Sequence, residues 1–65
     1  MSMQINLERR DNKTKRWDTV ATFEYGIYAM EAARALSETE EWEWRVVDTR
    51  WDDPMVIIYK EGIAS

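Results

Sequence analysis

One helix-forming segment stands between two pairs of strand-forming segments, and this arrangement constrains the fold more than any other feature. Residues Tyr25–Ser37, which read YGIYAMEAARALS, are the only segment with a clear helical period. The side chains that recur at this period predict the buried stripe of the helix: Ala29, Met30, Ala33 and Leu36. Strands on both sides must bury their apolar faces against this helix, because the chain offers no other layer.

Two residues near the start of the helix carry expectations of their own. Glu24 is expected where the exposed amides of the first helical turn favour a negative charge. Gly26 is a poor helix former in a helix interior, but it costs less near an end. There it leaves room for a neighbouring ring.

Four segments carry the alternation or the β-branched runs that are typical of strands. They are Gln4–Arg10, Arg16–Phe23, Trp42–Arg50 and Met55–Lys60. Turn-forming residues separate the two strands of each pair, Asp11–Thr14 in the first and Asp52–Pro54 in the second. Residues Ile63–Ser65 are expected to form a loose tail.

The alternation also assigns the tryptophans to faces of the sheet. Trp17 has the phase of Phe23, and Trp42 has the phase of Trp44, which predicts that all of them face the helix. Trp51 breaks this phase beside the second turn. It is either exposed, as an interface anchor would be, or packed over the edge of the hairpin.

These elements predict an α+β fold in which one helix packs on one face of a single, mostly antiparallel sheet of four strands. Sixty-five residues make one domain, 1–65. The chain has no Cys and no His, so neither disulfides nor the usual zinc ligands stabilise it. The strand order is left open between two hairpins that meet through a parallel central pair and a plain meander.

The charges are unevenly distributed along the chain. Thirteen acidic and nine basic residues give a net charge of −4, which argues against a domain built mainly to hold a phosphate backbone. The basic residues crowd the first quarter: Arg9, Arg10, Lys13, Lys15 and Arg16. An acidic stretch occupies the middle: Glu38, Glu40, Glu41 and Glu43. The sequence therefore predicts one basic end and one acidic side.

No residue pattern indicates catalysis. Without His or Cys the common nucleophile–base triads are excluded, and two isolated glycines make no phosphate-binding loop. Asp48, Asp52 and Asp53 lack the spacing of a calcium loop and are expected to form a turn. We therefore expect a protein that is not an enzyme and needs no cofactor and no metal.

The chain shows no sign of export or membrane insertion. Its N-terminal segment lacks the apolar run of a signal peptide, and the longest apolar run, Met55–Tyr59, is too short to cross a membrane. A cytoplasmic protein is expected.

Three surfaces are candidates for contact with another protein. The first is the outer face of the helix, with Ile27, Tyr28, Glu31 and Arg34, and Trp51 is a separate anchor. The second is the acidic stretch. The third is the uncovered sheet face, where exposed Val56 and Ile58 would favour covering by a second copy or by a partner.

The residues Trp17–Phe23 (WDTVATF), the alanine-rich helix and Arg45–Asp48 (RVVD) carry a resemblance. Over residues 4–60 the chain resembles small stand-alone proteins of bacteriophages and bacteria with a strand-strand-helix-strand core. Some of these are phage inhibitors of host defence, including anti-CRISPR proteins, which bind a host protein and occlude it. The resemblance implies a host protein as partner and the host cytoplasm as location. It implies no catalytic residues.

The leading hypothesis from the sequence is a non-enzymatic protein-interaction module that acts by occlusion. Its acidic stretch would compete for a basic, nucleic-acid-binding surface on the target. The alternative is a small single-stranded nucleic-acid-binding protein that uses the basic hairpin from Arg9 to Trp17. A homodimer with a structural role is a third possibility.

Overall fold

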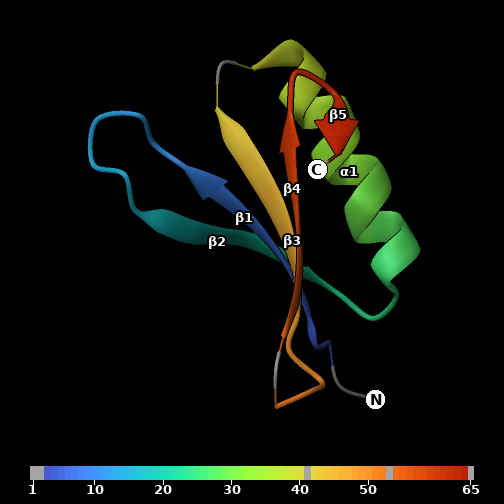
Figure 1. Cartoon of the computed structure of the whole chain (residues 1–65). Coiled ribbons are helices and arrows are strands. Elements are labelled where there is room, and N and C mark those ends of the chain that lie inside the picture. The colour runs from blue at the N-terminus through green and yellow to red at the C-terminus, as the bar shows by residue number, and fades with distance from the viewer. Residues whose placement is uncertain (1–2, 41, 53, 65) are drawn as a thin grey trace.

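A single helix covers one face of an antiparallel sheet in the computed structural model, which describes residues 3–40, 42–52 and 54–64 (Figure 1). The α+β class and the four predicted strands are confirmed. The helix α1 spans Gly26–Thr39. The strands are β1 (Ile5–Arg10), β2 (Trp17–Phe23), β3 (Glu43–Asp48), β4 (Met55–Lys60) and β5 (Ile63–Ala64).

The strand order is β2-β1-β3-β4-β5, and every pair of neighbours is antiparallel. After β2 the helix carries the chain back across β1, so that β3 runs in the same direction as β2 and opposite to β1. The two expected arrangements, a parallel central pair and a plain meander, are therefore both wrong. In the central pair Ile5 lies opposite Asp48, and Arg10 lies opposite Glu43.

β5 is a fifth strand where a loose tail was expected. Glu61 and Gly62 both have positive φ angles, 55° and 79°, and form the tight turn that returns the chain from β4. Ile63 then pairs with Lys60 on β4. Ser65 lies outside the described residues. Glycine suits this turn because it adopts a left-handed conformation at no steric cost.

The helix lies close to the sheet because its buried stripe consists of small side chains. Ala29, Ala33 and Ser37 recur every four residues and are buried. They pack over the apolar centre of the sheet, which includes Ile5, Leu7, Trp44, Val46 and Tyr59. The prediction for Met30 is wrong, because its side chain is 39% exposed at the edge of the helix. Leu36 is half-buried and packs against the core.

A bulge in β2 moves Trp17 to the sheet face that the helix does not cover. Leu7 pairs with Ala21 but Glu8 pairs with Thr19, so Val20 has no partner on β1. An extra residue in one strand reverses the facing of every side chain beyond it. Trp17 therefore shares its face with Arg10, and the prediction that it faces the helix is wrong. Trp44 is buried in the core, and Trp42 packs against it.

A buried hydroxyl joins the helix to the turn between β4 and β5. The Ser37 hydroxyl donates to the Arg34 carbonyl at 2.9 Å and accepts a hydrogen bond from the Gly62 backbone N–H, also at 2.9 Å. Gly62 also lies against the side chain of Glu38, since a Cβ added at this glycine would stand 2.5 Å from Glu38 Cγ. The C-terminal turn is thus fitted to the last turns of α1.

We expect the two tryptophans to differ sharply in their contribution to stability. Trp44→Ala empties a fully buried site and should lower the free energy of unfolding by about 3–5 kcal/mol, most of the stability of so small a domain. Trp17→Ala removes only contacts on the uncovered face and should cost about 1 kcal/mol. Urea denaturation followed by circular dichroism measures both. Equal losses would contradict the assignment of Trp17 to the uncovered face.

Ser37→Ala should destabilise the fold by about 1–3 kcal/mol, because it leaves the Gly62 N–H without its partner. Thr39→Ala is the matched control, since the Thr39 hydroxyl is exposed and bonds only carbonyls of its own helix. The control should change the free energy of unfolding by less than about 0.5 kcal/mol. A Ser37→Ala variant as stable as the control would show that this hydrogen bond does not hold the turn.

Candidate functional site: an apolar end with a pocket

Large apolar side chains are exposed at one end of the molecule. The start of β1, the end of β2, the end of β3 and the start of β4 lie side by side. Their register shows this, because Ile5 pairs with both Phe23 and Asp48, and Asp48 pairs with Met55. The first turn of α1 and the β3–β4 loop follow directly from these strands (Figure 1). We call this region the apolar end and define it by its exposed side chains: Tyr25, Ile27, Tyr28, Met30, Trp51 and Met55.

An apolar pocket of about 170 Å³ opens at the apolar end, between α1 and the start of β4. Its walls include Ile5 and Val46, two core side chains that are almost fully buried. The pocket is lined by Ile5, Gly26, Met30, Val46, Asp48, Met55 and Ile57. Gly26 was expected to make room for a ring, but no atom lies within 4 Å of a Cβ added there. The absence of a side chain at Gly26 therefore keeps the pocket open.

An ion pair stands at the polar wall of the pocket. The Arg50 guanidinium donates to both Asp48 carboxylate oxygens, through Nε at 2.9 Å and Nη2 at 2.6 Å. These hydrogen bonds hold the pKa of Asp48 below its usual range, and Asp48 raises the pKa of Arg50. Trp51 also contributes, to a smaller extent, to the lowering of the Asp48 pKa. Its exposed indole therefore lies near Asp48, which lines the pocket.

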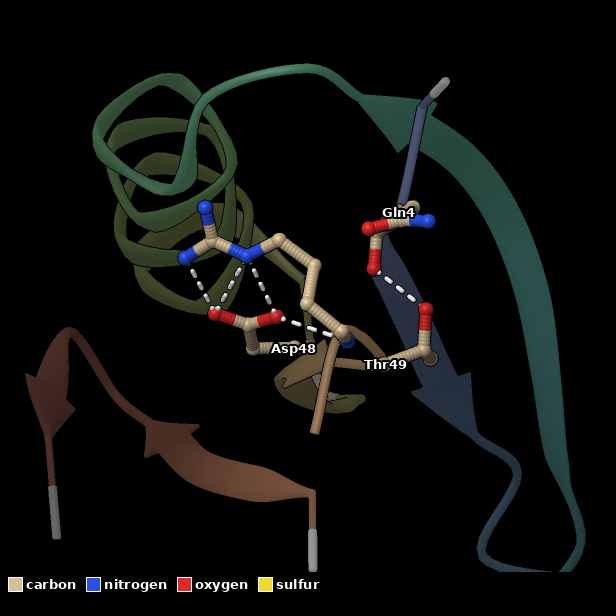
Figure 2. Close-up of polar contacts among 4 residues, drawn as sticks. Gln4, Asp48 and Thr49 are labelled. Carbon is tan, nitrogen blue, oxygen red and sulfur yellow. Dashed lines mark hydrogen bonds and ion pairs between the residues drawn. The ribbon is translucent and has the colours of Figure 1, made fainter. Parts of the chain in front are cut away.

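The neighbouring residue fixes the end of β3 to β1. The Thr49 backbone N–H and hydroxyl both donate to the Gln4 carbonyl, at 2.9 and 2.6 Å. Figure 2 shows Thr49 directed at Gln4, while the Asp48 carboxylate lies apart from them with its own hydrogen bonds. The backbone that carries the polar wall of the pocket is thus anchored to the central strand.

The unpaired charges of the apolar end are negative. Within residues 3–5, 22–31, 48–52 and 54–57, Arg50 is the only cation, and Asp48 neutralises it. Glu24, Glu31 and Asp52 have no ion pair within the described parts of the chain. Glu24 precedes Tyr25, the N-cap residue, and the first helical turn contains no acidic residue, contrary to expectation. Glu24 therefore adds an unpaired negative charge just before the helix.

The candidate residues on the outer helix face are all exposed, as is Trp51. Ile27 is 64% exposed and Tyr28 is 58% exposed. The ring of Tyr28 meets that of Tyr25 edge to face, with 6.1 Å between centroids. Glu31 and Arg34 are exposed on the same helix, and Arg34 approaches Glu38 at 3.6 Å. Only Ile27, Tyr28, Glu31 and Trp51 lie at the apolar end.

The acidic stretch does not form a continuous free surface. Glu43 pairs with Arg10 at 2.6 Å, on the sheet face opposite the helix. Glu38 lies between Arg34 and the Gly62 turn. Glu40 is exposed and has no ion pair with another described residue, and Glu41 lies outside the described residues.

The basic residues of the first quarter divide into two sets. Arg9 stacks over the Trp42 ring at 4.6 Å, and Arg10 is held by Glu43. Lys13, Lys15 and Arg16 are exposed at the β1–β2 turn and have no ion pair within the described residues. A wide opening of about 300 Å³ lies between this turn and Trp42. The free cations thus stand at the other end of the strands from the apolar end.

Most charged side chains on the uncovered sheet face have partners within the chain. Arg45 pairs with Glu8 at 2.6 Å and stacks over the Trp17 ring at 4.3 Å. Thr19 also donates to Glu8, at 3.0 Å. Near the apolar end this face is uncharged, with Val47 buried, Ile58 half-buried and Val56 45% exposed. The apolar area exposed on this face is therefore smaller than the sequence predicts.

Comparison with known proteins finds no matching family model, curated protein or solved structure. No helix within the described residues is long and apolar enough to cross a membrane. Over the same residues, no group of three or more acidic side chains is placed to hold a metal ion. The site must therefore be interpreted from its own geometry.

Sequence reasoning missed three parts of the apolar end: Tyr25, Met30 and Met55. The sequence pattern predicts Tyr25 as the first helical residue, Met30 as part of the core and Met55 as an ordinary strand residue. Nothing in the local pattern marks the pocket, because it depends on the strand order that places Gly26 beside Met55. The signal that was available is the glycine itself, an unfavourable residue at the start of the only helix.

The Asp48–Arg50 pair should make stability depend on pH in the acidic range. Because the folded pKa of Asp48 lies below its unfolded value of about 3.9, the pair stabilises the fold above that pH and its contribution is lost as the pH falls through the folded pKa. Asp48→Asn should therefore be less stable than wild type at pH 7, and the difference should narrow below about pH 4. Urea denaturation over a pH series measures it, with Asp52→Asn as the control. A difference that persists unchanged at low pH would contradict this role.

Proposed function

We propose that the protein is a non-enzymatic interaction module that binds another protein through the apolar end. The observation that carries this proposal is that six large apolar side chains are exposed at one end of the molecule, and that two of them, Met30 and Met55, line an open apolar pocket. Three of the six are Tyr or Trp, the residue types that most often dominate binding energy.

The total surface of the chain supports the same proposal. The chain exposes 4883 Å², whereas a folded monomer of its mass exposes about 4,400 Å² on average. The excess is expected when one helix covers a sheet of five strands. A bound partner at the apolar end would remove part of this surface from water.

The resemblance to phage inhibitors suggests how such a module acts. A small rigid protein bound to a functional surface of a host protein blocks that surface without chemistry of its own. The apolar end supports occlusion better than acidic mimicry, because Glu38 and Glu43 already have cationic partners within the chain.

The nucleic-acid alternative is favoured by one observation, the three unpaired cations at the β1–β2 turn. Two arginines of the proposed basic hairpin are engaged elsewhere, Arg9 with Trp42 and Arg10 with Glu43. Trp17 does lie on the uncovered face, but Arg45 stacks over its ring. Three free cations remain to bind a phosphate backbone, and the net charge of −4 on the whole chain opposes such binding.

A comparative capture experiment tests the proposal. Wild-type protein, a triple variant of the apolar end (Ile27→Ser, Tyr28→Ser and Trp51→Ser) and a control of the turn (Lys13→Ser, Lys15→Ser and Arg16→Ser) are each immobilised and exposed to nuclease-treated bacterial lysate. We expect proteins that bind the wild type and the control but not the apolar-end variant. All six positions are exposed, so both variants should keep the wild-type melting temperature within a few degrees.

Two results would contradict the proposal. If the three baits capture the same proteins, the apolar end does not select a partner. If a parallel experiment with untreated lysate shows capture that depends on the turn cations and is absent from the nuclease-treated lysate, the nucleic-acid alternative is correct instead. For a purified partner, removing one anchor side chain should weaken binding about tenfold or more by calorimetry.

A further inference from the structure

We propose that the pocket of the apolar end receives one bulky apolar side chain carried by a basic segment of the partner protein. This inference rests on the proposed function and names the chemistry of the partner. It combines two independent observations, the size and lining of the pocket and the negative charge of the apolar end.

The pocket has the size and lining for a single apolar side chain. Its volume of about 170 Å³ compares with the roughly 150 Å³ of an apolar cavity that accepts benzene, so a leucine or phenylalanine side chain fits. Met30 and Met55 stand at opposite walls of the opening, one on the helix and one on β4. Methionine side chains adapt their shape to an inserted group. The occupant therefore contributes an anchor, not an extended ligand.

The polar wall of the pocket supplies no free charge for the anchor. Both Asp48 carboxylate oxygens accept hydrogen bonds from Arg50. A charged group inserted beside them would lose its hydration without gaining an unpaired counterion. This favours an uncharged, apolar anchor.

The charges of the apolar end bear on the residues around the anchor. Glu24, Glu31 and Asp52 are the charged residues at this end that have no ion pair within the described residues, and all are negative. We call these three residues the acidic rim of the apolar end. Lysine or arginine beside the anchor would meet complementary charge. A second copy of this chain would instead bring the same acidic rim against itself in a two-fold contact, which is unfavourable. The turn cations of another copy carry no exposed apolar anchor. The occupant is therefore a basic segment of a different protein.

Gly26 offers a way to close the pocket without damaging the fold. A side chain added there meets no atom within 4 Å at its Cβ, and replacing glycine in a helix favours helix formation. Gly26→Leu should therefore fill the pocket and keep or raise the melting temperature. Ala35→Leu is the matched control, since it adds a leucine to the exposed face of the same helix.

The binding probe is a short fluorescein-labelled peptide with lysines and arginines around one central leucine. Fluorescence anisotropy at low salt should show saturable binding to wild type and to Ala35→Leu. Binding to Gly26→Leu, and binding of a peptide with alanine in place of the leucine, should be about tenfold weaker or lost.

The contribution of the acidic rim to binding is tested with two triple variants that each remove three negative charges. Neutralising the rim (Glu24→Gln, Glu31→Gln and Asp52→Asn) should weaken peptide binding several-fold at low salt and much less at high salt. The control neutralises three carboxylates away from the pocket (Asp18→Asn, Glu40→Gln and Glu61→Gln) and should leave affinity nearly unchanged. Equal effects of the two sets would show that net charge, and not the rim, attracts the peptide.

The outcomes separate this inference from the proposed function. If the peptide fails to bind, or binds Gly26→Leu as well as wild type, while lysate capture still depends on the apolar end, the inference is overturned and the proposed function stands. If capture is also independent of the apolar end, both fall. Light scattering over a range of concentrations provides a further check. If the wild type forms a dimer and Gly26→Leu does not, the pocket is occupied by a second copy of the chain and the inference is overturned.

Discussion

The fold depends on the close contact between the small side chains of α1 and the two central strands. Ala29 and Ala33 have no atoms beyond Cβ, so the helix backbone comes near β1 and β3 and seals Ile5, Leu7 and Val46 from water. A helix of 14 residues is only about 21 Å long, and it cannot cover every strand of a five-stranded sheet. The uncovered remainder at the start of β4 is the pocket. The same contact that makes the core thus leaves the candidate site open.

The two uncovered parts of the sheet differ in how many of their exposed side chains have partners within the chain. On the face opposite the helix, Glu8, Arg45 and Thr19 bond one another, and Trp17 lies against the guanidinium of Arg45. Such a network needs no partner, because its charges are neutralised and its ring is partly shielded. At the apolar end the ring contact is the edge-to-face pair of Tyr25 and Tyr28, and the aromatic residues remain more than half exposed. That contrast is why contact with a partner is assigned to the apolar end.

The local sequence pattern predicted the helix and the longer strands. The bulge and the pocket depend on pairing between distant segments, which the local pattern does not reveal. The helix, the four longer strands and the exposure of Ile27 and Tyr28 follow from periodicity, which depends only on near neighbours. The bulge at Val20 does not, because the sequence alternates through it without interruption and only the register with β1 reveals the extra residue. The pocket likewise requires β4 to lie beside α1, a consequence of strand order. The exposure of Ile27 and Tyr28 was therefore predictable, whereas the pocket was not.

The central position of β1 has a consequence for how the chain acquires its structure. β1 leaves the ribosome first, but its second neighbour is β3, and the Gln4 carbonyl is bonded by Thr49, 45 residues further along the chain. An isolated two-stranded hairpin is at best marginally stable in water. The growing chain therefore cannot form the β1–β3 pair until β3 has been synthesised and has left the ribosome. Truncation within β3 would abolish the whole fold and not merely shorten it.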